Sequence, residues 1–445
     1  MAMQFEKSRF EGIDLSPVQI QSGREMVAEL SATNLKLAVH DILELEKSDL
    51  GCYDYIIAHG VYSWVPAEVQ QKILLICRDH LSENGLAYVS YNSYPGWHGK
   101  QALQRILRYH TRRLDDPRDK AGAALSLLAA YPGLEESPND PGIILVQRLL
   151  HDLENIEDPL TYLVHEYLVD TNEPLYFRDF LDRVEAAGLR YVDDAYPGST
   201  ALDRLPPSSR QWVSESFTDI VEQQQYVDFI CNTSFRRSLL CRSGISLDQD
   251  VTYDRLLSLN VTATCRHHDS RNGVVSFRSD PGRVFSVEHA ALRKALDRLV
   301  MERPRSLSVG QILSVLGTDV SDDQAAHMID SLLRNAAIEL TAHPCLCTLE
   351  IAERPYVSRL VRYQSRHGTV TNAAHRPFGL VNAFEQHLVS LLDGTRTVSE
   401  LIDELKHSLT PDKPVSDAEY EKLVRGQLQR LVGAGLLQDP ECECL

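Results

Sequence analysis

The sequence has no long hydrophobic run, no excess of positive charge and no cysteine framework. No segment approaches the roughly eighteen uninterrupted apolar residues of a membrane-spanning helix. The start, MAMQFEKSRF, has the features of neither a secretion signal nor a transit peptide. The nine cysteines are scattered and odd in number, which is typical of reduced thiols. We therefore expect a cytoplasmic protein without a membrane span.

The 445 residues carry a formal net charge of −18, which disfavours generic binding to nucleic acid or to anionic lipid. The arginines between positions 105 and 113 are a local exception, but their spacing is that of the solvated face of a helix. With 43% hydrophobic and 24% charged residues, the composition is that of an ordinary globular protein. At roughly 100 to 200 residues per domain, we expect two to four domains.

Short apolar runs alternate with helical periods over the first hundred residues, which predicts βα units around a mostly parallel sheet. The predicted strands span residues 10–13, 35–39, 53–58, 86–91, 189–192 and 235–242. The predicted helices of this region span residues 17–30, 67–80 and 176–187. A turn is expected at 82–85. Polar or glycine residues follow three of the first four strands, at the edge where open α/β sheets bind ligands.

Changes of pattern divide the chain into five predicted segments. Residues 1–98 hold the first strands, and residues 99–170 hold helices broken by Pro and Gly clusters, which predicts an inserted helical subdomain. The sheet resumes in residues 171–244. Residues 245–350 and 351–445 each show a helix, a short helix beginning at a Ser or Thr cap and a longer amphipathic helix, which is the layout of a winged-helix-like module.

Acidic residues stand at the ends of two predicted strands. A carboxylate in the position of Asp14 can accept hydrogen bonds from both hydroxyls of a ribose, although an Asp in a strand–helix turn is more often solvated or capping. Asp41 can face an adenine amino group, and Ile42 can cover its ring. After the next strand come His59 and Gly60, then aromatic residues that either wall a pocket or pack the core, of which core packing is commoner.

Several strings resemble a known family, the class I S-adenosylmethionine (SAM) dependent methyltransferases that carry a methyltransferase regulatory domain. The strings are GIDLSP, YDYIIAHGVYSWVP, NGLAYVSYNSYPGWH, LVHEYL and EAAGLRYVDDA, and with the helices between them they cover most of residues 9–195. The resemblance implies an α/β fold: a Rossmann-like sheet with an inserted helical subdomain and a mainly helical, winged-helix-like C-terminal region. Some members of the family methylate protein lysines in bacteria.

The resemblance also implies SAM as the cofactor and a macromolecular acceptor, most simply a protein side chain such as lysine. Asp14 would then bind the ribose of SAM, Asp41 the adenine, and His59 would lie beside the methionine part. The implied cofactor-binding residues are Asp14, Leu15, Asp41, Ile42, His59 and Gly60.

Methyl transfer from a sulfonium depends chiefly on holding a nucleophile in line with the methyl carbon, and a lysine must also lose its proton. The residues proposed for that positioning or deprotonation, which the sequence does not rank, are Tyr62, Tyr91, Tyr94, His59 and, from the helical insertion, His165, Glu166 or Tyr167. Asn92 and Trp97 belong to the same region, which would face the transferred methyl group.

The sequence departs from the family at its start. The family places a strand and a glycine-rich loop before the GIDLSP equivalent, whereas eleven residues precede Gly12 here and none of them is Gly. That strand lies at the centre of the family's sheet, so we expect two half-sheets with unpaired edges. The competing explanations are a start codon placed too late or a truncated chain, an inactive natural remnant, and a strand supplied from elsewhere. The first is favoured because the later motifs are intact, and the alternative function is an inactive methyltransferase-like scaffold for regulation or interaction.

Other site types find little support. Cys265, His267 and His268, and the pair Cys345 and Cys347, have ligand chemistry but no second pair at zinc-site spacing, so no metal is expected. A nicotinamide-dependent oxidoreductase needs a G-x-G-x-x-G string before the strand that ends in an acid, and no such string is there. The G-x-S-x-G elbow of many hydrolases is missing too.

Overall fold

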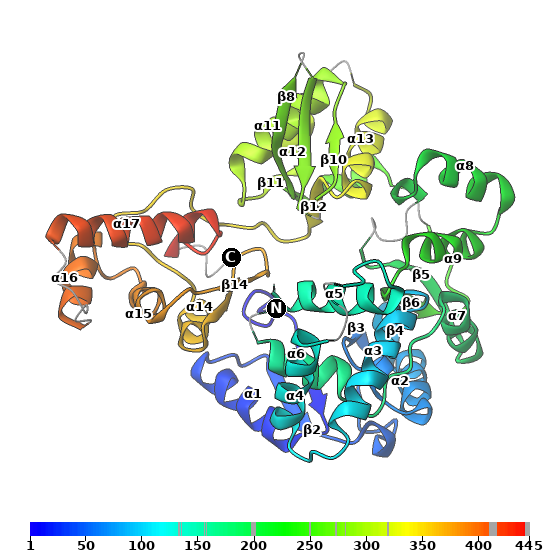
Figure 1. Cartoon of the computed structure of the whole chain (residues 1–445). Coiled ribbons are helices and arrows are strands. Elements are labelled where there is room, and N and C mark those ends of the chain that lie inside the picture. The colour runs from blue at the N-terminus through cyan, green and yellow to red at the C-terminus, as the bar shows by residue number, and fades with distance from the viewer. Residues whose placement is uncertain are drawn as a thin grey trace. The chain divides into compact units, whose positions relative to one another are not determined.

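The computed structural model describes residues 1–131, 134, 136–154, 156, 158–196, 202–248, 251–271, 274–280, 282–317, 320–408 and 416–440. By its internal contacts the chain divides into two compact units (Figure 1). One unit combines Met1–His40 with Gln249–Leu445, and the other is Asp41–Asp248.

A four-stranded sheet in the order β3-β4-β6-β5 forms the centre of the unit Asp41–Asp248. Its strands are β3 (Tyr53–Ala58), β4 (Leu81–Asn92), β5 (Leu189–Asp194) and β6 (Phe235–Arg242). β3 and β4 are parallel, whereas β6 is antiparallel to both β4 and β5. The sheet is therefore mixed, with β5 and β6 added after the helical insertion.

Three helices pack near this sheet: α2 (Ala67–His80), α7 (Phe177–Ala186) and α9 (Ile220–Cys231). The apolar residues of α2 recur at helical spacing, so Ile73, Leu74 and Cys77 face one side and are buried in the core under the sheet. Helix α8 (Pro207–Ser216) precedes α9 and packs against it.

The inserted helices have a core of their own. They are α3 (Gly96–Thr111), α4 (Pro117–Ala129), α5 (Pro141–Glu154) and α6 (Pro159–Tyr167). Two of the Pro residues that break the sequence pattern follow Asp caps and occupy the first helical turn, where the missing N–H is not needed. The Pro clusters thus mark where these helices begin.

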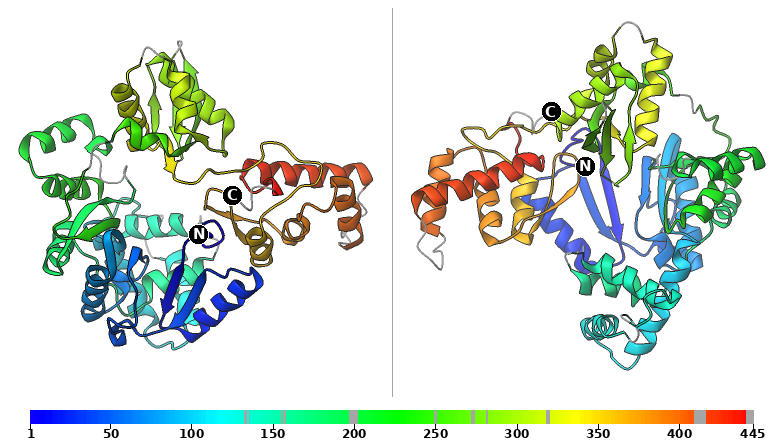
Figure 2. Two further views of the ribbon diagram at one scale, coloured as in Figure 1. Left: turned by 180° about the vertical axis from the view of Figure 1, so that it is seen from behind. Right: turned by 45° about the horizontal axis from the view of Figure 1, so that its top comes forward.

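In the other unit, β1 (Phe10–Asp14) and β2 (Leu35–Val39) form a separate parallel pair, with α1 (Pro17–Glu29) beside them (Figure 2). A Cβ added at Gly23 would lie 2.6 Å from the Leu37 side chain, so the glycine allows α1 to approach the pair closely. Among the described residues, β1 pairs only with β2 and β3 only with β4. The expected separation into two half-sheets is confirmed for this part of the chain.

Two further modules complete the same unit. The first contains α10 (Tyr253–Leu257), β7 (Asn260–Ala263), β8 (Cys265–Arg271), β9 (Val274–Ser279), β10 (Val284–Ser286), α11 (Ala290–Glu302), β11 (Leu307–Ser308), α12 (Val309–Leu316), α13 (Asp322–Arg334) and β12 (Ile338–Thr341). The second contains α14 (Arg359–Gln364), β13 (Thr369–Thr371), β14 (Pro377–Gly379), α15 (Ala383–Leu391), α16 (Val398–Ser408) and α17 (Asp417–Gly433). Each module has its own hydrophobic core.

The start of β4 differs from the prediction. We expected a turn at residues 82–85 and a strand only from residue 86, but β4 begins at Leu81. Its pairing with β3 jumps from Tyr53 opposite Leu81 to Tyr55 opposite Leu86, so the intervening residues bulge out of the register. The polar and glycine residues that indicate a turn accommodate this bulge.

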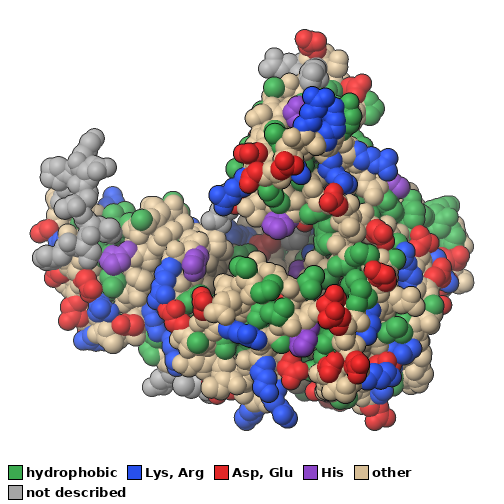
Figure 3. All heavy atoms as spheres, turned by 90° about the horizontal axis from the view of Figure 1, so that it is seen from below, with side chains coloured by type: hydrophobic (Ala, Val, Ile, Leu, Met, Phe, Trp, Pro, Cys, Tyr) green, Lys and Arg blue, Asp and Glu red, His purple; other side chains and the backbone are tan. Residues whose placement is uncertain are grey.

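No helix in the described ranges combines the length and the apolar character that crossing a membrane requires. On the face shown in Figure 3, acidic and basic side chains are interspersed.

A buried ion pair joins α9 to β6. The Arg236 Nε atom lies 2.7 Å from an Asp228 carboxylate oxygen, and each side chain is only 1% exposed. The guanidinium also donates to the side chain and backbone carbonyls of Gln224 and lies 3.6 Å from the ring centroid of Phe177. Burial raises the pKa of Asp228, although the positive charge of Arg236 lowers it in part. Removal of either side chain would therefore leave the other as a buried charge without its partner.

We predict that Arg236→Met lowers the free energy of unfolding by about 3–5 kcal/mol, because it leaves a buried carboxylate unpaired. The deficit should shrink toward acidic pH, since protonation of Asp228, whose pKa is raised in the folded state, removes the unpaired charge. Urea unfolding at neutral and acidic pH measures both effects. Arg190→Met on the exposed side of β5 is the control, with a change within about 0.5 kcal/mol. Equal losses in the two variants would contradict the prediction.

Candidate functional site

The end of β1 presents an exposed carboxylate. Oδ1 of Asp14 accepts a hydrogen bond from the Ser16 backbone N–H at 2.7 Å, and Ser16 in turn caps α1. The Asp14 carbonyl accepts from the His40 N–H, which joins the ends of β1 and β2. Leu15 is 68% exposed beside it. One carboxylate oxygen thus holds the turn, and the structure gives the other no partner among the described residues.

Asp41 and Ile42 lie at the start of the second unit. Oδ1 of Asp41 accepts the Leu43 N–H at 2.9 Å and so caps a short 3-10 helix, Ile42–Glu44. The Ile42 side chain is half-buried against the hydrophobic core of that unit. An acidic cap next to an apolar side chain is the combination proposed for an adenine ring.

The ends of β3 and β4 meet in a polar cluster, the His59 corner, which consists of His59, Gly60, Tyr88 and Ser90. His59 Nδ1 lies 3.1 Å from Ser90 Oγ and 3.2 Å from the Tyr88 hydroxyl. Ser90 Oγ accepts the Gly60 N–H at 2.9 Å, which leaves its own proton for His59. Tyr88 and Ser90 thus hold the His59 ring in orientation through Nδ1.

Gly60 keeps the His59 corner open. Its φ of +68° lies in the left-handed region that favours glycine, and a Cβ placed there would meet no atom within 4 Å. His59 is exposed as well. Gly60 thus leaves one side of the corner uncovered.

Two of the predicted catalytic residues lie in the core beneath the corner. Tyr62 and Tyr91 are almost fully buried, and Tyr91 stacks on Phe180 at 4.0 Å between ring centroids. Neither hydroxyl has a hydrogen-bond partner among the described residues. Burial raises the pKa of both phenols, although Arg183 partly offsets the rise at Tyr62. Both rings pack in the hydrophobic core. A catalytic role for either tyrosine stays a prediction.

Tyr94 lies in the loop after β4 and belongs to an aromatic group. Its ring stacks on His98 at 4.2 Å, and its hydroxyl donates to Gln101 at 2.7 Å. Tyr176 lies 5.2 Å from the Tyr94 ring, and its hydroxyl is 2.9 Å from His98 Nε2. The ring of Tyr94 is thus fixed in orientation and half-buried.

His165 stands apart from these groups. It is exposed on α6, next to Glu166, and among the described residues no hydrogen bond or ring contact joins it to Tyr62, Tyr91, Tyr94 or His59. Burial raises the pKa of Glu166, and Lys100 and His165 oppose that rise. The catalytic role predicted for His165 stays a prediction.

Two contacts at the His59 corner, and one at Asn92, were not predicted from the sequence. Ser90 and Tyr88 were not predicted to contact His59, and Ser63 accepts the Asn92 N–H at 2.8 Å. The available signal was the alternation of AYVSYN, which puts Tyr88 and Ser90 on the same face of β4.

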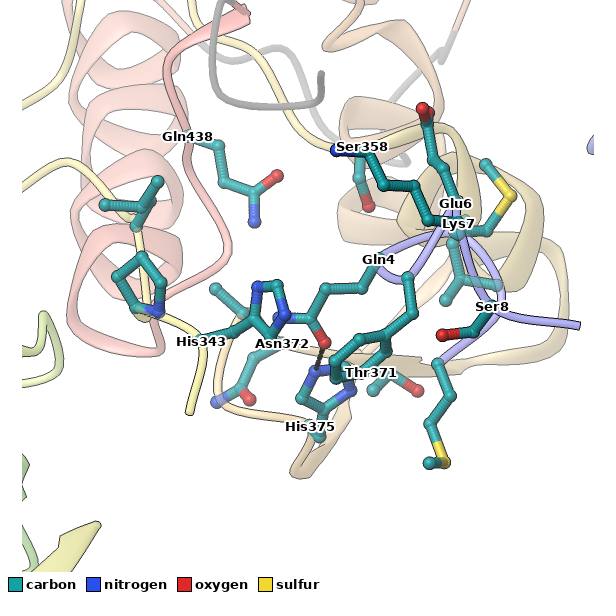
Figure 4. A pocket seen from close by; sticks show the side chains of 17 residues that line it. Gln4, Glu6, Lys7, Ser8, His343, Ser358, Thr371, Asn372, His375 and Gln438 are labelled. Carbon is teal, nitrogen blue, oxygen red and sulfur yellow. Dashed lines mark hydrogen bonds between the residues drawn. The ribbon is translucent and has the colours of Figure 1, made fainter. Parts of the chain in front are cut away.

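A cavity of about 490 Å³ lies in the unit of Met1–His40 with Gln249–Leu445 (Figure 4). Residues 1 and 3–8 form one wall, and loops around His343 and His375 form the other. Gln4 points toward His375, with 2.5 Å between Gln4 Oε1 and His375 Nε2, and Phe5 meets His343 edge to face. None of the predicted site residues lines this cavity.

Sequence models of three families match the chain. A methyltransferase domain matches residues 1–113, a predicted methyltransferase regulatory domain matches residues 159–242, and the C-terminal winged helix domain of PKMT matches residues 353–433. The matches follow one another along the chain without overlap.

Two relatives come from Rickettsia prowazekii. Uncharacterized protein RP789 is 26% identical over 454 residues, which cover 97% of this chain and 81% of the relative. Uncharacterized protein RP028 is 33% identical over 181 residues, which cover 41% of this chain and 71% of the relative.

A solved structure resembles nearly the whole chain. PKMT2 from Rickettsia typhi, in complex with AdoHcy, matches with a TM-score of 0.80 and 25% identity, covering 98% of this chain and 90% of that chain. A second structure of PKMT2 matches with a TM-score of 0.81. The likeness includes the sheet and the C-terminal modules alike.

The loop after β4 is held by backbone hydrogen bonds on two sides. The Tyr94 N–H donates to the Leu175 carbonyl, and the Gly96 N–H donates to the Thr233 carbonyl. A Cβ at Gly96 would come within 2.6 Å of the Asn232 carbonyl oxygen, so only glycine fits this approach. Gly96 therefore sets the position of the loop that carries Tyr94.

We predict that Gly96→Ala destabilises the protein by about 1–3 kcal/mol, because the added methyl group meets fixed backbone. Gly122→Ala is the matched control, since a Cβ in that helix meets nothing within 4 Å. It should stabilise by about 0.5–1 kcal/mol. Chemical unfolding of both variants measures the effects, and changes of the same sign would refute this account.

Proposed function

We propose that this chain, which belongs to the SAM-dependent methyltransferases that carry a methyltransferase regulatory domain, transfers a methyl group to a protein side chain, with lysine as the acceptor. Methyltransferase activity and SAM as cofactor follow from the family. What we propose beyond the family's activity is that the acceptor is a protein, and one observation supports this. The likeness to PKMT2 extends over 98% of this chain, so it includes the modules beyond the sheet.

Each of the residues proposed for the cofactor has the chemistry to hold its part of SAM. Asp14 keeps one carboxylate oxygen for a ribose hydroxyl, a hydrogen bond strengthened by the negative charge. Asp41 and Ile42 combine an acidic cap with an apolar side chain, which suits an adenine. The open side of Gly60 leaves room beside His59 for the methionine part. Each of these positions is exposed or half-buried, so a ligand can reach it.

Bound SAM would supply a methyl group on a sulfonium. The lysine amine must be neutral to attack, because a protonated amine has no lone pair. With SAM bound, a new N–C bond would replace the C–S bond, AdoHcy would be the leaving group, and the nitrogen would give up a proton to a base or to water. His59, held through Nδ1 by Ser90 and Tyr88, can use Nε2 to orient the reactants. The ring of Tyr94 can stabilise positive charge near the amine.

We predict that Asp14→Asn weakens SAM binding by about 10- to 100-fold, since it replaces a charge-assisted hydrogen bond by a weaker one. Calorimetric titration with SAM measures the change. The control is Glu11→Gln, which removes a similar charge from the same strand and should leave the affinity within about twofold. If the wild-type chain fails to bind SAM, the cofactor assignment to this polypeptide is wrong.

Transfer to protein is tested separately. The wild-type chain, SAM and lysine-containing peptides are incubated, and mass spectrometry locates any added methyl group. Methylated lysine supports the proposal. Methylation confined to another residue type, or to a small-molecule acceptor, would contradict it even if SAM binds.

A further inference from the structure

A continuous series of aromatic rings leads from the loop after β4 to α8. Its members, which we call the aromatic track, are Tyr94, Tyr176, Phe229, Tyr226 and Trp212. Successive ring centroids are 5.2, 5.8, 5.6 and 5.4 Å apart. All five residues belong to the unit Asp41–Asp248, in which α9 packs against both α7 and α8 (Figure 1).

Part of the aromatic track faces solvent. Trp212 is 50% exposed and Phe229 is 45% exposed, and Ile230 is exposed beside Phe229 on the same helix. Single exposed aromatics are ordinary, but contiguous exposed apolar groups mark interaction sites. The track is also rigid: Phe217 stacks on Tyr226 at 4.2 Å and meets Trp212 edge to face. Little side-chain entropy is then lost when a partner binds.

Acidic side chains border the aromatic track. Glu215 follows Trp212 by three residues, and Glu222 precedes Tyr226 by four, so each lies on the same helix face as its aromatic neighbour. Both are exposed. Among the nearby cations, which include Arg204 and Arg210, Arg178 is 2.9 Å from Asp182, which offsets its charge. Aromatic faces next to carboxylates favour cations, because the rings attract them through their quadrupoles.

We propose that the aromatic track is the docking surface for a basic segment of the acceptor polypeptide, whose lysine and arginine side chains lie over the rings between Glu215 and Glu222. That this polypeptide is the methyl acceptor rests on the proposed function, because the track begins at Tyr94, in the region assigned to the methyl group. An acidic segment would meet carboxylates of its own sign. The net charge of −18 adds long-range attraction for a basic partner.

The test measures binding of two labelled peptides by fluorescence anisotropy. One alternates Lys and Ala, the other Glu and Ala, at equal length. The wild-type chain should bind the basic peptide and not the acidic one. The double variant Trp212→Leu with Phe229→Leu keeps apolar volume but removes two aromatic rings. It should weaken binding of the basic peptide by about tenfold. Tyr109→Leu, an exposed aromatic outside the track, should change binding by less than about twofold.

Each outcome decides the proposal. Selective loss in the double variant, with SAM binding retained as proof of folding, supports it. Equal affinity for both peptides, wild-type affinity in the double variant, or an equal loss in Tyr109→Leu overturns it. The single variants Trp212→Leu and Phe229→Leu give the same test should the double variant fail to fold. If the wild-type chain binds the basic peptide but not SAM, the proposed function fails while the docking surface stands.

Discussion

The buried pair of Asp228 and Arg236 fixes the geometry on which much of the second unit depends. Each of the two side chains is only 1% exposed, so each charge needs the other as its partner. The pair joins α9 to β6 and so fixes the short segment 232–234 between them. In that segment the backbone carbonyl of Ser234 accepts the N–H of Ser93, at the end of β4. Phe229 directly follows Asp228 in the sequence. One interaction thus positions both the loop that carries Tyr94 and the exposed face of α9.

Local patterning predicted much of the fold because its signals lie within a few residues. The strands at 35–39, 53–58 and 235–242 and the helix at 67–80 match the structure residue for residue. The bulge at the start of β4 was missed because a polar stretch with glycine indicates a turn and a bulge equally well. The acidic ends of β1 and β2 were visible in the sequence because a strand end is a local feature.

Contacts between distant residues could not be predicted in this way. The hydrogen bond from Ser90 to His59 depends on the register of two strands, and the burial of Tyr62 depends on a helix more than a hundred residues later. The grouping of Met1–His40 with the C-terminal modules rests on pairs such as Glu29 with Arg366, 2.7 Å apart. No periodicity within either segment records such a pair.

The packing around Trp212 gives the molecule an optical property. The sequence has three tryptophans, and Trp97 is 2% exposed, with Trp64 5.9 Å away, whereas Trp212 is half in water beside Tyr226. Water reddens and quenches indole emission, so the exposed indole contributes a component separable from the shielded one. Energy absorbed by Tyr226 can also pass to Trp212 across 5.4 Å. Intrinsic emission therefore reports the surroundings of α8 without an added dye.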